Sequence, residues 1–247
     1  MTAAQETTRA WPQWTRRSRV YTIANVCKQY QVPRERAPLA RLVMRRTKAE
    51  SEQTRRRIVA AARRVFARRG VTRSTLDHVA DAAGVTRGAI YWHFDNKLAL
   101  FEAMRELVSL PLVDRIDFTL LNGTHADPLD AVEGFLRELV LSMESDRATR
   151  ETFEITLLKC EYVDEFEPEL KRQVKRSHEL LDKLRATYAR AQRAGTLRKD
   201  LSPDMAALET CVFTTGLFRL CLIDRAGSLI RKRVDPLIAA HVRTRRA

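Results

Sequence analysis

The chain of 247 residues is 45% hydrophobic and 31% charged, and its formal net charge at pH 7 is +14. This size suits one or two globular domains whose cores need no disulfide or structural metal, and the low glycine and proline content favours an all-α chain. The four cysteines show no C-x-x-C spacing, so they are expected to be free thiols in a reducing cytoplasm, which excludes a disulfide scaffold: Cys27, Cys160, Cys211 and Cys221.

The positive charge is concentrated at the N-terminal end. Residues 1–110 carry 22 basic and 9 acidic side chains, whereas residues 111–247 carry 23 and 22. We therefore expect the basic N-terminal end to bind phosphate groups. The rest of the chain, whose charges balance, is expected to have a role that does not depend on net charge.

Residues 1–43 show neither helical nor strand periodicity, and Pro12, Pro33 and Pro38 break any helix. They also lack the apolar core of a signal peptide. We expect a disordered basic extension.

The next segment, from Glu50, has a helical pattern. Five apolar residues recur at i, i+3, i+4, i+7 and i+8, which predicts one buried stripe that ends at Gly70: Ile58, Ala61, Ala62, Val65 and Phe66. Arginines cover the rest of this helix and are expected to form mainly a solvated face.

The segment TLDHVADAAGVTRGAIYWHFDNK, residues 75–97, predicts two short helices joined by a sharp turn. Gly84 stops the first helix and Thr86 caps the second, which leaves basic and aromatic side chains outside. That geometry is typical of a helix-turn-helix that presents its second helix to the DNA major groove. The alternative is an ordinary helical hairpin in which Tyr91 and Trp92 are half-buried packing residues.

This segment, with MRRTKAESEQTRRRIVAAARRVFARRGV before it and EITLLKCE from Glu154 to Glu161 after it, resembles the TetR family of bacterial repressors. The likeness is to the multidrug-efflux (AcrR-like, MexZ-like) branch and covers roughly residues 44–245. It implies a helix-turn-helix DNA-binding domain at 44–97 and a helical ligand-binding and dimerisation domain at 98–247. Because MRRTK is similar to the usual start of the family, residues 1–43 are either a misplaced translation start or a basic arm.

We predict ten DNA-contacting residues. Arg87 is expected to read a guanine edge with Thr86 beside it, Gly88 to allow close approach, and the arginines before the first helix to follow the backbone or minor groove. Phosphate contacts are assigned to Tyr91, His93 and Lys97, and the resemblance implies one at Thr75. The full set is Arg45, Arg46, Thr75, Thr86, Arg87, Gly88, Tyr91, Trp92, His93 and Lys97.

Downstream, a long helix is expected from Lys97, capped by Asn96 or Asp95 and interrupted by Pro111. Amphipathic helices follow at residues 128–145, 147–160 and 165–194. The nearly uncharged segment from Met205 to Leu222 is read as a helix buried on both faces, because Glu209, Arg219 and three threonines argue against a membrane span.

The resemblance implies that the last two helices, about Pro203–Arg225 and Val234–Arg243, pair with a second subunit. A homodimer would place its two DNA-binding domains about one helical turn of DNA apart, ~34 Å, on a pseudo-palindromic operator.

A pocket for a small hydrophobic inducer is implied by resemblance between seven residues: Phe101, Met104, Phe135, Leu139, Met143, Cys160 and Phe218. The alternative for Cys160 is a small core residue, and His178 is expected to be a partly exposed helix residue.

No nucleophile–base constellation, phosphate loop, cofactor motif or metal-ligand spacing occurs, so we expect no enzyme, cofactor or metal. The expected function is a cytoplasmic, ligand-responsive repressor, in particular of a multidrug efflux operon. The alternative is a non-specific architectural DNA binder, against which the neutral body of over 100 residues argues.

Overall fold

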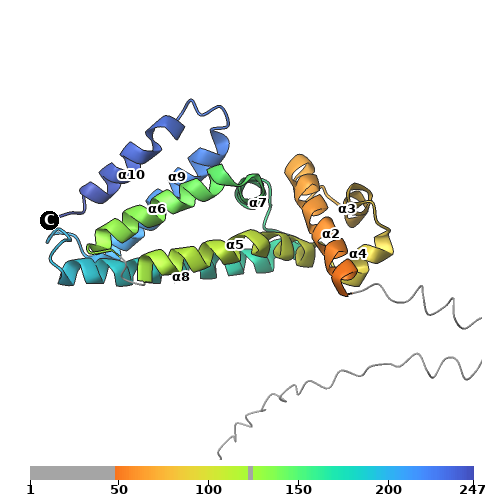
Figure 1. Ribbon diagram of the computed structural model, residues 1–247, viewed down its shortest axis with the longest axis horizontal. Coiled ribbons are helices and arrows are strands. Elements are labelled where there is room, and N and C mark those ends of the chain that lie inside the picture. Colours follow the sequence, from red (N-terminus) through yellow and green to blue (C-terminus); the bar gives the residue numbers. More distant parts are fainter. Residues whose placement is uncertain (1–47, 122–124) are drawn as a thin grey trace, which may run out of the picture. The chain divides into compact units, whose positions relative to one another are not determined.

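A computed structural model describes residues 48–121 and 125–247, and the side chains of 109–111 lie outside that description. The predictions for the N-terminal extension, Arg45 and Arg46 therefore fall outside the described residues. The described part is helical (Figure 1), which confirms the fold class. Its elements are α2 (Lys48–Arg69), α3 (Leu76–Ala83), α4 (Arg87–His93), α5 (Lys97–Leu121), α6 (Pro128–Ser145), α7 (Arg147–Leu158), η3 (Asp164–Phe166), α8 (Glu167–Arg193), α9 (Pro203–Ile223), η4 (Arg231–Arg233) and α10 (Val234–Arg243).

The head consists of α2, α3, α4 and the start of α5. The predicted apolar stripe of α2 is buried, and its Phe66 packs 6.3 Å from Phe101 of α5, between ring centroids. Its arginines do more than face solvent: Arg57 donates to the Ala83 carbonyl at 2.8 Å, so α2 also satisfies the open C-terminal end of α3.

Local capping sets the turn geometry in the head. Thr86 accepts from the Ala89 backbone N–H at 3.2 Å, as predicted, and Thr75 accepts from that of His78 at 3.2 Å. Gly84 closes α3 with φ 63°, a left-handed conformation that a side chain disfavours. Asn96 caps α5 through the Ala99 N–H at 2.8 Å.

Helix α5 runs without a break from Lys97 to Leu121, so the prediction that Pro111 interrupts it is wrong. Proline lacks the N–H that would bond to the carbonyl of the residue four positions earlier, but the turns on either side retain their own hydrogen bonds. Helix α5 packs against α6, α7 and α8.

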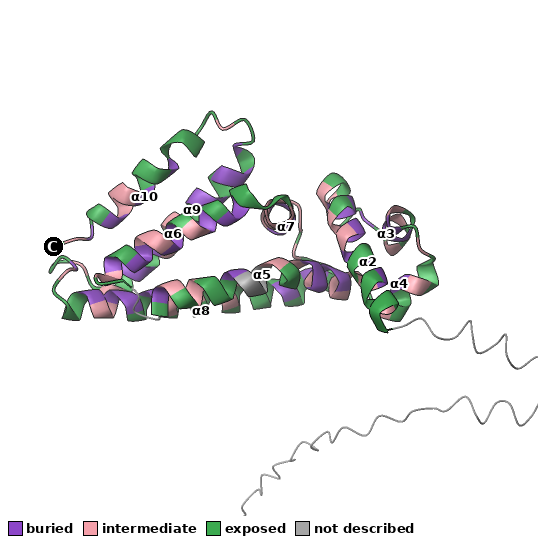
Figure 2. Cartoon of the chain, viewed as in Figure 1, coloured by how far each residue is buried: buried purple, intermediate pink, exposed green. Residues whose placement is uncertain are grey.

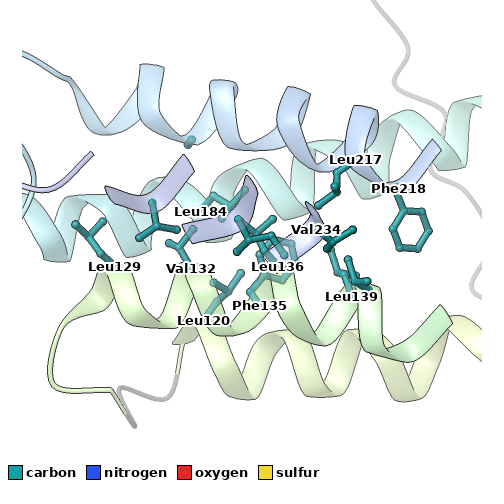
Figure 3. Packing of buried hydrophobic residues seen from close by; sticks show 14 of the residues in the cluster. Leu120, Leu129, Val132, Phe135, Leu136, Leu139, Leu184, Leu217, Phe218 and Val234 are labelled. Atoms are coloured by element: carbon teal, nitrogen blue, oxygen red, sulfur yellow. The ribbon is translucent and has the colours of Figure 1, made fainter. Parts of the chain in front are cut away.

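The body packs α6, α8, α9 and α10 around one core, seen as the buried faces in Figure 2. Figure 3 shows side chains of α6 pointing toward those of α8, α9 and α10, among them Phe135, Leu136, Leu184, Leu217 and Val234. Helix α6 begins and ends as the periodicity predicts, because it has a clear apolar stripe and a proline in its first turn. Helix α10 has the bounds that the resemblance implied.

Head and body are joined by α7 and the segment after it. The Val71 N–H donates to the Lys159 carbonyl at 3.1 Å, and the Lys159 ammonium donates to the Ala67 carbonyl. Arg63 pairs with Glu151 at 3.1 Å, and the side chains of Ile155 and Phe166 are buried in the core of the head. The residues after Leu158 therefore belong structurally to both parts.

Among the described residues, α9 is long and apolar enough to cross a membrane by length and composition. Eight of its residues are buried within this chain, including Thr210, Leu217 and Phe218. In the single chain α9 is buried on one face, and burial of the other face stays a prediction. The exposed apolar residues of α9 are Met205, Leu208, Val212, Leu220 and Ile223.

Candidate nucleic-acid interface

Helix α4 is held by one buried residue and exposes its aromatic side chains. Ile90 is fully buried, whereas Trp92 is 82% exposed and Tyr91 46% exposed. An indole so exposed contributes little to packing, which argues against the alternative of an ordinary hairpin with Trp92 as a packing residue. The outer face of α4 therefore leaves its aromatic side chains available to a partner outside the chain.

Arg87 lies on this face and is already oriented. Its guanidinium is 3.4 Å from the Tyr91 hydroxyl and 3.4 Å from Asp77, and it lies over the Tyr91 ring at 5.6 Å from the centroid. The hydrogen bond to Tyr91, followed by the charge of Asp77, raises the pKa of Arg87. These contacts orient the guanidinium before any partner binds, and the fork keeps free donors for a base edge.

The remaining predicted contacts at the turn are compatible with close approach of a backbone. Each threonine of the two caps accepts a backbone N–H, which leaves its hydroxyl proton available for a phosphate oxygen. A Cβ added at Gly88 would meet nothing nearer than the Thr86 hydroxyl at 4.0 Å. The fold itself therefore does not require glycine there, and close approach of a duplex at Gly88 stays a prediction. His93 is half-buried at the end of α4, with its ring 6.3 Å from that of Phe94.

Lys97 lies in a different environment from the one its predicted role suggests. Its ammonium is 2.9 Å from Glu165 and 3.5 Å from the Thr72 carbonyl, and it lies 5.4 Å from the centroid of the Phe166 ring. Only 16% of its side chain is exposed. A contact from Lys97 to phosphate stays a prediction, and it requires the lysine to exchange Glu165 for the DNA.

Comparisons with known proteins show to which family this helix-turn-helix belongs. The sequence profile of bacterial regulatory proteins of the tetR family matches residues 58–104, which contain α3 and α4. The HTH-type transcriptional regulator TtgR of Pseudomonas putida is 36% identical over 184 residues, which are 73% of this chain and 86% of TtgR. The chain belongs to the TetR family.

Solved structures of repressors have a fold similar to that of this chain. NalD, the secondary repressor of the MexAB-OprM multidrug efflux pump in Pseudomonas aeruginosa, has a TM-score of 0.70 at 28% identity over 80% of this chain and 98% of its own. A complex of SmeT with triclosan has a TM-score of 0.65 at 26% identity over 76% and 90% of the two chains. SmeT is the repressor of a Stenotrophomonas maltophilia multidrug efflux pump.

The seven residues predicted to border a TetR-family ligand pocket fall into two clusters. Phe101 and Met104 are buried in the core of the head, with Cys160 packed against it. The other four lie in the core of the body: Phe135, Leu139, Met143 and Phe218. The structure does not bring the seven together around one space, so a shared pocket stays a prediction. Burial raises the pKa of the Cys160 thiol to about 12, which suits the alternative of a small core residue.

Sequence reasoning missed a buried charge cluster in this TetR-family body. Glu169 is fully buried and pairs with Arg105 at 3.1 Å and Arg176 at 2.6 Å, while Arg172 bridges it to Glu102. Burial and then the charge of Arg176 lower the pKa of Arg105. The cluster cross-links α5 and α8. In the sequence, the only indication of this cluster is the position of Glu169 in the first turn of α8, where acidic residues are favoured.

Proposed function

We propose that this TetR-family chain is a cytoplasmic transcriptional repressor that binds a pseudo-palindromic operator. A small hydrophobic ligand releases it, and the regulated genes form a multidrug efflux operon. The observation that carries this proposal is the outer face of α4, where exposed Trp92 and Tyr91 flank the oriented Arg87 on a capped helix-turn-helix. The similarity to NalD and SmeT, which are repressors of multidrug efflux pumps, supports the choice of operon.

Two heads are needed for selectivity, because one helix of seven residues makes few base contacts. The exposed apolar residues of α9 and Leu237 of α10, which is 40% exposed, support a homodimer through these helices. Such a face in a single chain is typical of a subunit interface.

Release follows from a shift between two conformations. Helix α5 begins in the head, at Lys97, and ends in the body, so a ligand that favours another packing of the body moves both heads away from operator spacing. A hundredfold loss of DNA affinity requires a differential affinity of about 3 kcal/mol.

The test begins by selecting bound fragments of the source genome with the purified full-length protein. Affinity for the selected site and for a scrambled site is then measured over a range of salt concentrations. A repressor keeps a large ratio between the two sites, whereas an architectural binder shows little preference at any salt. Triclosan, present in the SmeT complex, serves as an apolar probe that should lower affinity for the selected site. A ratio near one at all salt concentrations would overturn the proposal.

A further inference from the structure

A cavity of about 730 Å³ lies where α2 meets the body. Its walls come from the last turns of α2, from α7 with the end of α6, and from the connection between α9 and α10. In Figure 1, α7 and α4 lie on opposite sides of α2, so the cavity is on the face of α2 away from the proposed DNA-binding helix. Its volume is within the range of small-molecule sites, about 300–1,000 Å³.

Most residues of the lining are charged, and they carry more positive than negative charge. Three carboxylates, Glu144, Glu151 and Glu154, face six cations: Arg68, Arg147, Arg150, Lys159, Arg225 and Arg231. This excess of three positive charges lies at a place where both the head and the body contribute side chains. An apolar inducer would leave these charges without water, so the cavity suits an anion.

Each of the three carboxylates is already paired with a neighbour, and Glu144 pairs with Arg231 at 3.6 Å. Glu154, whose side chain is 11% exposed, pairs with Lys159 at 2.7 Å and also with Arg225. Glu151 pairs with Arg147 at 2.8 Å and with Arg63 on the head at 3.1 Å. A cationic ligand would find no unpaired carboxylate at either position.

Two arginines of the lining form no ion pair with any described residue. Arg150 uses its Nη2 atom to donate to the Cys221 and Leu222 carbonyls, at 3.0 and 3.2 Å. Arg68 donates through Nε to the Arg64 carbonyl at 3.4 Å. Both guanidinium groups retain donors for the oxygens of an anion, in the planar fork that matches carboxylate and phosphate.

The connection that carries Arg225 and Arg231 is fixed by one carboxylate. Asp224, which is buried, accepts backbone N–H groups from Ser228 at 2.9 Å and Ile230 at 2.9 Å, and also from Leu229 and Arg231. These hydrogen bonds, that from Ile230 foremost, lower the pKa of Asp224 to about 2. The loop therefore presents its arginines to the cavity in a set position, which reduces the ordering cost of binding.

We propose that this cavity binds a small organic anion through phosphate or carboxylate oxygens, as a second ligand site separate from the apolar inducer. The anion connects Arg68 of the head with the arginines of the body, and its binding stabilises the junction between the two.

The experiment uses the full-length protein without DNA, so its outcome is independent of the proposed repressor function. Inorganic phosphate and citrate are titrated separately by isothermal calorimetry, with sodium chloride adjusted to hold the ionic strength constant. We expect saturable binding of at least one probe. Binding of phosphate alone identifies a phosphate ligand, binding of citrate alone a carboxylate ligand, and binding of both a site for either oxygen type.

Arg68→Gln and Arg231→Gln test the site from its two sides. Each should weaken binding at least tenfold, about 1.4 kcal/mol. The matched control is Arg69→Gln, which removes an exposed arginine from the same turn of α2 that does not line the cavity. It should bind the probe as the unaltered protein does. Thermal unfolding followed by circular dichroism verifies that each variant is folded.

Two results would overturn the proposal. One is the absence of saturable binding for both probes. The other is an equal loss of affinity in Arg69→Gln and the cavity variants, which would assign the effect to the general positive charge of the chain.

Discussion

Arg87 illustrates how a side chain can be oriented for recognition before its partner arrives. Asp77 and Tyr91 hold its guanidinium on the outer face of α4, where 63% of the side chain remains exposed. A base edge competes with these two contacts, so the net gain is smaller than for an unrestrained arginine, while the ordering cost is lower.

Arg87→Ala should therefore weaken operator binding by about 1–3 kcal/mol and relax the preference at one base pair per half-site. Titration of the selected operator, of single-base variants and of random DNA measures both effects. An equal loss of affinity on random DNA would reduce Arg87 to a phosphate contact.

His241 is a half-buried titratable group of the body. Its Nε2 is 3.0 Å from the Thr210 hydroxyl and its ring stacks on Phe213 at 4.0 Å. Burial, and secondarily the charge of Arg245, lowers its pKa to about 3. The unfolded chain therefore binds a proton near the ordinary histidine pKa while the folded chain does not, so the stabilisation is present above about pH 6.5 and is lost as the pH falls toward 3.

In that window His241 should lower the free energy of unfolding by up to about 1.4 kcal/mol for each pH unit. His241→Phe keeps an aromatic ring and removes the titration, so its urea midpoint should fall less between neutral and mildly acidic pH. His178→Gln, which removes an exposed histidine of α8, is the control and should retain the original pH dependence. Parallel curves for the original chain and His241→Phe would contradict the assignment.

At the scale of elements, the segment after α7 controls the start of α5. Glu165, the middle residue of η3, holds Lys97 at 2.9 Å, so this segment keeps the lysine away from solvent in the absence of DNA. If Lys97 contacts phosphate, its release from Glu165 is part of the cost of binding.

Glu165→Gln should then strengthen binding to all DNA sequences and make the slope of log K against log salt steeper by about one. Glu167→Gln is the matched control, because it removes an exposed carboxylate two residues away that pairs with Lys171. The double variant Lys97→Ala, Glu165→Gln should lose the gain. If both glutamate variants strengthen binding equally, the effect is one of net charge alone.

The elements that the sequence predicts well are those defined by local chemistry. The caps at Thr86 and Asn96, and the stop at Gly84, involve residues within a few positions of one another. Pro111 misled the prediction because proline ends helices in many sequences, whereas α5 continues through this position.

Ion pairs across elements could not be predicted. Arg63 and Glu151 are 88 positions apart, and the contacts of Lys97 and Glu169 also join separate helices. Periodicity marks such residues as polar and exposed, because it carries no information about which helix covers them. For the same reason the proposed anion cavity, lined by charged residues from four separate segments, had no signal in the sequence.

At the scale of the whole molecule, the exposed apolar face of α9 defines the expected assembly. Gly216 lies on this helix, is exposed, and has no atom of this chain within 4 Å of the position of an added Cβ. Nothing within the chain thus opposes a larger side chain there.

Gly216→Glu should give monomers or aggregates by light scattering and abolish tight operator binding, because a buried unpaired carboxylate costs several kcal/mol. Weak binding by single heads should remain, with the ordinary salt dependence. Ser177→Glu places the same charge on the exposed face of α8 and should remain dimeric. A soluble, dimeric Gly216→Glu chain that binds its operator tightly would show that the dimer forms elsewhere.

The exposure of Trp92 has a spectroscopic consequence. The chain has three tryptophans, of which Trp11 and Trp14 lie outside the described residues, and replacing these two by phenylalanine leaves Trp92 as the sole indole emitter. At 82% exposure its fluorescence reports water. Docking of α4 into a groove removes that water and places bases and phosphates beside the ring, so the emission should change in intensity and wavelength as DNA binds. Arrival at the duplex and departure on addition of an inducer then become observable in real time, without an attached dye.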